Sequence, residues 1–75
     1  MSEMAILGRE GDTKIIWSKD NADEVENARR TFDDLQKKGF TAFSVKGKDG
    51  EKGARVDKFD PNAERLIMIP RMVGG

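Results

Sequence analysis

One stretch decides the fold: residues 21–39, which read NADEVENARRTFDDLQKKG. Its apolar residues recur at steps of three and four and form a single stripe on a helix, made of Val25, Ala28, Phe32 and Leu35. Asn21 can accept hydrogen bonds from the first free backbone amides, and Glu24 stands at the spacing of a capping box. Gly39 can adopt the left-handed conformation that ends a helix. These residues predict an amphipathic helix that lies on a sheet.

Five short stretches around this helix have the composition of strands. They are residues 4–7, 13–17, 40–45, about 54–59 and 65–69. The last stretch is apolar after its first residue, and Pro70 ends it by removing a backbone donor. A strand of this kind is typical of the middle of a sheet, with both faces buried. Glycines in residues 8–12 and 46–53 predict a tight reversal and an exposed connection.

The resulting order is strand, strand, helix, strand, strand, strand, which is the element order of a β-grasp. We therefore predict an α+β domain with a β-grasp-like fold, in which one amphipathic helix packs across a mixed sheet of four to five strands. The domain covers residues 1–70, and residues 71–75 form a flexible C-terminal tail. The alternative is a split-sheet arrangement in which the first stretch stays unpaired.

The composition predicts a soluble protein of the cytoplasm. The chain has 75 residues, 36% hydrophobic and 37% charged, so one small core is expected. Lys plus Arg and Asp plus Glu both number 14, which gives no overall attraction to nucleic acid or to an anionic membrane. Cysteine is absent, so disulfides do not support the fold. No apolar run approaches the length of a membrane span, and the start lacks a signal-peptide pattern.

The residue types argue against an enzyme. Histidine and cysteine are both absent, which removes the common general base, the thiolate nucleophile and the soft metal ligands. Adjacent carboxylates at 23–24 and 33–34 diverge on a helix and do not share a site. The carboxylates at 57, 60 and 64 lack the spacing of a calcium loop, and the lysines of 46–53 lack that of a phosphate-binding loop. We expect no catalysis, no metal and no cofactor.

The end of the sequence carries the most specific signal. Residues 64–75 read ERLIMIPRMVGG: an acidic residue, an apolar strand, a proline stop and a short tail. Gly74 and Gly75 have no side chains, so they form a thin arm that can enter a narrow channel and present a terminal carboxylate for activation. This run resembles the tails of ubiquitin-like β-grasp carriers, particularly the small subunit of molybdopterin synthase and its sulfur-carrier relatives.

The resemblance implies a carrier that a partner enzyme activates. In such a family the terminal glycine carboxylate is adenylated, and it then becomes a thiocarboxylate or is joined to a lysine amine. Carried over to this chain, Gly75 is the reacting residue and Gly74 is the spacer. The residues of the tail that contact the partner are then Pro70, Arg71, Met72 and Val73. Because sulfur carriers commonly have a second proline where Arg71 stands, and the ubiquitin branch has an arginine before the diglycine, sulfur transfer and protein tagging both stay open.

A different class of function needs no reactive tail. The chain would then be a small non-catalytic interaction or structural module, of the kind that phages and mobile elements encode, docking by a strand edge or an apolar patch. Candidate anchors are Trp17, Met68 and Met72, because tryptophan and methionine are enriched in interfaces. Burial in the core is the competing interpretation for the first two.

In both classes the expected partner is a protein, either an activating enzyme or a larger assembly. A domain of this size can also assemble with other copies, because its own stability is small. A third class, nucleic-acid binding, would use the basic residues Lys46, Lys48, Lys52, Arg55 and Lys58. It is the least favoured, because a net positive charge and interleaved stacking aromatics are both missing.

Overall fold

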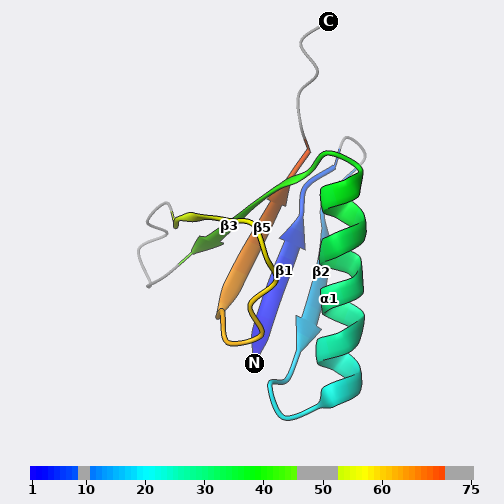
Figure 1. Cartoon of the computed structure of the whole chain (residues 1–75), viewed down its shortest axis with the longest axis vertical. Helices are drawn as coiled ribbons and strands as arrows, with labels where there is room; N and C mark the ends of the chain where they lie inside the picture. The colour runs from blue at the N-terminus through cyan, green and yellow to red at the C-terminus, as the bar shows by residue number, and fades with distance from the viewer. Residues whose placement is uncertain (9–10, 46–52, 71–75) are drawn as a thin grey trace, which may run out of the picture.

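A computed structural model gives the chain as an α+β domain of two layers (Figure 1). It describes residues 1–8, 11–45 and 53–70. In chain order the elements are β1 (Ser2–Ile6), β2 (Thr13–Trp17), α1 (Ala22–Lys37), β3 (Thr41–Val45), β4 (Arg55–Val56) and β5 (Arg65–Ile69). The predicted class is confirmed, since one helix packs on a mixed sheet to which the described residues contribute five strands.

Strand β5 lies in the middle of the sheet, whose order is β2-β1-β5-β3-β4. It runs parallel to β1, with Leu66 opposite Met4, and antiparallel to β3, with Met68 opposite Ala42. β2 and β4 pair antiparallel at the two edges. The central position predicted for residues 65–69 is confirmed. The split-sheet alternative is wrong, because β1 is paired on both sides.

The ends of α1 follow from its capping residues. Asn21 Oδ1 accepts hydrogen bonds from the backbone amides of Asp23 (3.1 Å) and Glu24 (3.2 Å). The Glu24 carboxylate accepts from the amide of Ser18 at 2.9 Å, which fixes the chain just before the helix. After the helix, Gly39 has a φ of 99°, a left-handed conformation that favours glycine. The predicted helix and both its ends are confirmed, but the capping box is not formed: the Asn21 amide donates to the carbonyl of Ser18, and Glu24 accepts from the amide of Ser18 instead.

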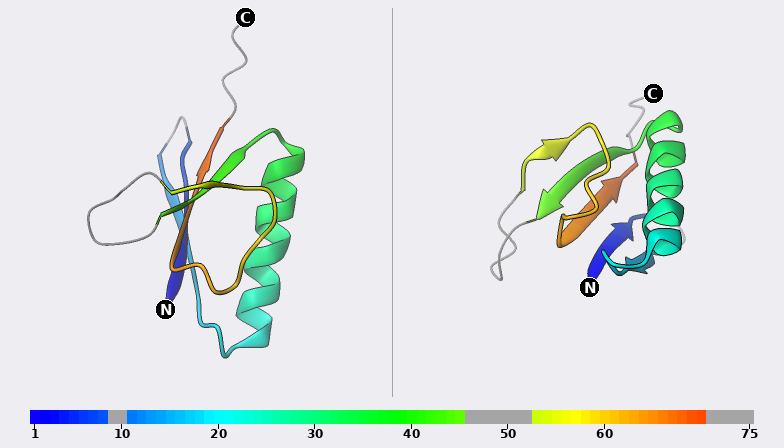
Figure 2. Two further views of the ribbon diagram at one scale, coloured as in Figure 1. Left: turned by 60° about the vertical axis from the view of Figure 1, so that its left-hand side comes forward. Right: turned by 60° about the horizontal axis from the view of Figure 1, so that its bottom comes forward.

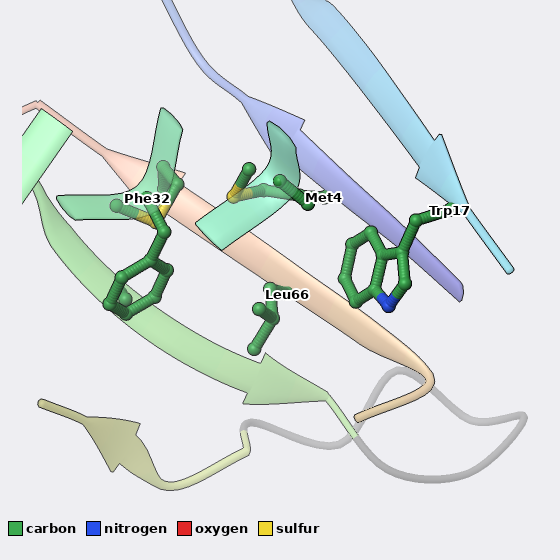
Figure 3. Packing of buried hydrophobic residues seen from close by; sticks show 7 residues of the cluster. Met4, Trp17, Phe32 and Leu66 are labelled. Atoms are coloured by element: carbon green, nitrogen blue, oxygen red, sulfur yellow. The ribbon is translucent and has the colours of Figure 1, made fainter. Parts of the chain in front are cut away.

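The core lies between α1 and one face of the sheet. Its fully buried side chains are Met4, Trp17, Ala28, Phe32, Ala42, Leu66 and Met68 (Figure 3). The indole nitrogen of Trp17 donates to the carbonyl oxygen of Pro61 at 3.2 Å, so the polar atom of this ring is satisfied. The interpretation of Trp17 as a partner-binding anchor is therefore corrected: its side chain has no exposed surface and fills the core.

Strand β4 is shorter than the strand predicted for residues 54–59. The chain turns away after Val56, and Phe59 packs on the rings of Trp17 and Phe32, with centroids 5.2 and 5.8 Å away. Gln36 holds the same segment by donating to the carbonyl of Asp57 at 2.9 Å. The β4–β5 connection therefore crosses the side of the sheet that α1 covers (Figure 2). Burial of an aromatic ring has overridden the local preference for a longer strand.

Phe32 tests the core from its helix side. We expect Phe32→Ala to lower the free energy of unfolding by about 3–5 kcal/mol, because it leaves a cavity against Phe59 and the sheet. The fluorescence of Trp17, the single tryptophan, reports urea unfolding directly. Arg30→Ala, whose side chain is 76% exposed, should change the same quantity by less than about 0.5 kcal/mol. Equal effects of the two substitutions would show that Phe32 is not a core residue.

Gly53 lets β3 and β4 approach each other. A Cβ atom added there would lie 0.8 Å from the carbonyl oxygen of Ser44, whose amide donates to Ala54 at 3.0 Å. We expect Gly53→Ala to cost about 3 kcal/mol, because the two backbones would have to separate. Urea unfolding followed by circular dichroism measures the loss, with Ala54→Ser at the exposed next position as the control. A Gly53→Ala protein as stable as this control would contradict the close backbone contact.

Candidate functional site

The helix covers one face of the sheet, and no described element covers the other (Figure 2). Because successive strand residues point to opposite faces, the residues paired across neighbouring strands form rows on the open face. One row crosses all five strands through Lys14, Ala5, Ile67, Phe43 and Arg55. The next row holds Ile16, Glu3, Arg65 and Val45, and Ile69 lies on the far side of the first row. Apolar residues thus form the centre of this face.

These apolar side chains, Ala5, Ile16, Phe43, Val45, Ile67 and Ile69, are called the sheet patch. Ile16 is 54% exposed and Ile69 is 39% exposed, and the other four residues are half-buried. The open face of such a sheet is ordinarily polar, because only the covered face has to exclude water. The register places Ala5, Ile67 and Phe43 side by side, with Val45 and Ile69 next to them along their strands. Ile16, in contrast, stands opposite Glu3. Exposed apolar side chains gathered in this way are typical of an interaction site. The sheet patch is therefore the strongest candidate site among the described residues.

The central strand shows most clearly how the burial of the two faces differs. Leu66 and Met68 are fully buried beneath α1, as the sequence predicts for a central strand. On the other face Ile67 is half-buried and Ile69 is largely accessible. The prediction that both faces of this strand are buried is therefore wrong for the single chain. A partner lying on the sheet would supply the cover that the sequence pattern anticipates.

Three charged residues beside the sheet patch form an ion-pair cluster. The Glu3 carboxylate lies 3.3 Å from the Lys14 ammonium nitrogen and 3.5 Å from the Arg65 guanidinium. Glu3 is 27% exposed, whereas Lys14 and Arg65 are 57% and 48% exposed. One carboxylate therefore faces two basic groups, and both basic groups remain accessible. The edge of the patch has an excess of positive charge.

The charges on the helix surface pair among themselves. Arg29 contacts Glu26 at 2.5 Å and Asp33 at 3.0 Å. The hydrogen bond from Arg29 lowers the pKa of the Glu26 carboxyl below its ordinary value, and the same bond raises the pKa of Arg29. All three side chains are about half exposed, so water screens these pairs and they are worth little. They form an ordinary solvated helix face.

A hollow of about 810 Å³ lies between the β3–β4 pair and the β4–β5 connection. Its lining includes the apolar side chains of Val56 and Ala63 and the carboxylates of Asp60 and Glu64. Oδ1 of Asp60 already accepts from the amide of Asn62 at 2.9 Å. Within residues 1–8, 11–45 and 53–70, no three metal-ligating side chains come together. This hollow holds no set of groups that would define a reaction.

The structure places the sequence-predicted site residues in three groups. Trp17 and Met68 are fully buried and belong to the core. Pro70 is half-buried and directly follows β5, at the end of the central strand. The remaining candidates, Arg71, Met72, Val73, Gly74 and Gly75, lie outside the described residues. The described part of the site is therefore the sheet patch together with the start of the tail.

Sequence reasoning missed Phe43 and Ile67 as surface residues of one site. The signal was present, because apolar residues occupy both faces in the strands 13–17, 41–45 and 65–69. Ile15 and Ile16 are adjacent and must point to opposite faces, and the same is true of Ala42 and Phe43. A sheet with two apolar faces and one helix leaves one of those faces open.

The chain matches no known protein-family model, no curated protein and no solved structure. No helix in the described parts of the chain is long and apolar enough to cross a membrane.

Adjacent isoleucines test which face of β2 is the core. Ile15 packs against the core cluster, whereas Ile16 is 54% exposed on the sheet patch. We expect Ile15→Ala to lower the free energy of unfolding by about 2 kcal/mol and Ile16→Ala by less than about 1 kcal/mol. Urea unfolding of the two variants gives the difference, and each serves as the control for the other. A larger loss at Ile16 would mean that its face is covered within the chain.

Proposed function

We propose that this chain is a small ubiquitin-like carrier or modifier with a β-grasp-like fold, activated at the carboxylate of Gly75. The observation that carries the proposal is the central position of β5 between β1 and β3. Together with one helix across a mixed sheet, this strand order is compatible with a β-grasp-like fold. The sequence after Pro70 continues from that central strand into Arg-Met-Val-Gly-Gly. The domain would be the handle, and the tail would be the reacting part.

The chemistry would take place in a partner enzyme. A carboxylate oxygen of Gly75 attacks the α-phosphorus of ATP and displaces pyrophosphate, which gives an acyl-adenylate. A sulfur nucleophile or a lysine amine then attacks the acyl carbon and displaces AMP, forming a thiocarboxylate precursor or an isopeptide bond. Gly74 and Gly75 carry no side chain that would block entry to a narrow channel. The chain lacks histidine and cysteine, and this route requires neither from it.

The contact with that enzyme would combine the tail with the body of the domain. Pro70, Arg71, Met72 and Val73 would guide the tail, and the sheet patch would hold the domain. Ile69 belongs to the sheet patch and directly precedes Pro70, so the two contacts adjoin on one strand. We assign the protein to the cytoplasm, with a protein as its partner. Sulfur transfer and protein tagging differ only in the nucleophile that receives the acyl group.

A second function is favoured by the exposure of the sheet patch itself. The chain would be a non-catalytic interaction or structural module that docks through this face or through the edge strand β2. Ile16 and Ile69 are large apolar side chains with 54% and 39% of their surface accessible. Burying them against a protein would be favourable, in proportion to the apolar area removed from water. This function makes no use of Gly75.

The tail decides between the two functions. We expect the full chain, incubated with ATP and a sulfur-carrier-activating or ubiquitin-activating enzyme, to gain the mass of an adenylate, thiocarboxylate or isopeptide product in intact-mass spectrometry. A variant lacking Gly74 and Gly75 should unfold at the same urea concentration and gain no mass, because only the reacting group is gone. Ile16→Ser is the matched control. It alters the sheet patch and keeps the tail, so it shows how much of any lost mass gain comes from weaker docking and not from loss of the reacting group.

Two results would count against the carrier function. In the first, the mass of the full chain stays unchanged after incubation with every such enzyme and ATP. In the second, the variant that lacks Gly74 and Gly75 still gains mass. For the docking module, the truncated chain should bind its partner as tightly as the full chain does.

A further inference from the structure

The sheet patch has basic residues at both of its ends. In the row that crosses the sheet, Lys14 precedes Ala5, and Arg55 follows Phe43. Arg65 stands in the next row, between Glu3 and Val45. All three basic residues are paired in the sheet with residues of the open face, and paired residues of neighbouring strands lie on the same face. They therefore share this face with the apolar residues. An apolar centre is thus flanked on opposite edges by guanidinium and ammonium groups.

Among the strand residues of this face, one carboxylate stands against these three basic groups. That carboxylate, Glu3, lies between Lys14 and Arg65 at 3.3 and 3.5 Å and is mostly covered. It balances one of the two charges beside it, so the face has an excess of about two positive charges. A hollow beside Arg65 is also lined by Lys19 and Glu64, whose opposite charges add nothing to the net charge. The whole chain has a formal net charge of zero, so the excess is local to this face. A partner approaching it meets a positive rim around an apolar centre.

We propose that the sheet patch docks an acidic protein surface, formed by apolar side chains flanked by aspartate or glutamate. The apolar side chains would cover Phe43, Ile67 and Ile69, and the carboxylates would meet Lys14, Arg55 and Arg65. Complementary charges of this kind favour the encounter and disfavour basic partners. The inference rests on the docking role proposed for the sheet patch and does not depend on the chemistry of Gly75.

The same residues argue for a protein rather than a nucleic acid or a lipid surface. Phe43 is the one aromatic residue of the sheet patch, whereas single-stranded nucleic acid is held by several stacking aromatics. Among the described strand residues, this face presents three basic groups, one on the central strand and one on each edge strand, and so few groups make few phosphate contacts. Aliphatic side chains at the centre instead match the apolar core of a protein interface, and charged residues at its edge match the rim.

The experiment uses two synthetic amphipathic helical peptides as probes. Both have leucines along one face; the first has glutamates on the flanks, and the second has lysines at the same positions. Each is titrated into the ¹⁵N-labelled full chain and followed by amide chemical shifts. We expect the glutamate peptide to shift Ile16, Phe43 and Ile67, and its binding to weaken as sodium chloride is raised. The lysine peptide should bind at least tenfold more weakly.

Two double variants test whether the basic residues at the edges of the sheet cause the preference for the glutamate peptide. The double substitution Lys14→Gln and Arg55→Gln removes two basic groups at exposed positions and should weaken binding of the glutamate peptide by about fivefold. Lys37→Gln with Lys38→Gln, at the C-terminal end of the helix, removes the same charge away from the sheet patch and should leave binding unchanged. Urea unfolding of both variants checks that the fold is intact.

The outcomes separate this inference from the functions it builds on. Equal binding of both peptides at the sheet patch would overturn the acidic preference and leave the docking role standing. Shifts confined to other surfaces, or no binding of either peptide, would overturn the inference and the docking role together. Tighter binding to phosphatidylserine vesicles than to the glutamate peptide would replace the acidic protein by a membrane. Activation of Gly75 is measured separately, by the mass gain of the full chain, so failure of the acidic preference and failure of the carrier function are distinguishable.

Discussion

The constraint on which the rest of this structure depends is that one helix can cover only one face of a five-stranded sheet. The chain uses α1 for the face that carries Met4, Leu66 and Met68, and this creates its fully buried core. Nothing in the described residues covers the opposite face, although Phe43 and Ile67 make its centre apolar. Both faces therefore have an apolar centre, but only one of them is buried, and the open face also carries charged residues at its margins. The open face is explained by the number of elements available in a short chain, and its apolar character calls for another explanation.

An aromatic cluster completes the covered face together with Phe32 of the helix. Trp17 lies on the edge strand β2, and Phe59 comes from the β4–β5 connection to pack against it. The hydrogen bond from the indole to Pro61 joins residues 44 positions apart and gives this contact a fixed orientation. Moving Phe59 into the core shortens β4 to two residues. In the described part of the chain, the β4–β5 connection therefore contributes to the face covered by the helix and leaves the opposite face open.

Local signals in the sequence were sufficient for the order of the elements and insufficient for the length of β4 and for the assignment of the faces. Asn21 and Gly39 mark the helix ends through contacts with residues close in sequence, and the apolar run at 65–69 marks the central strand. The burial of Trp17 and the short β4 depend on contacts between distant segments, which no local pattern contains. Adjacent apolar residues such as Ile15 and Ile16 also fit either orientation of their strand. Only the position of the helix decides which of them is covered.

The central strand relates the two proposed functions to each other. β5 contributes Ile67 and Ile69 to the sheet patch, and the sequence continues from it through Pro70 to Gly75. A carrier whose own residues supply no catalytic group needs a non-covalent contact that holds it while an enzyme acts on its end. A structural module needs the same contact and nothing more. Docking through the sheet patch is thus common to both functions, and they differ in whether the residues after β5 react.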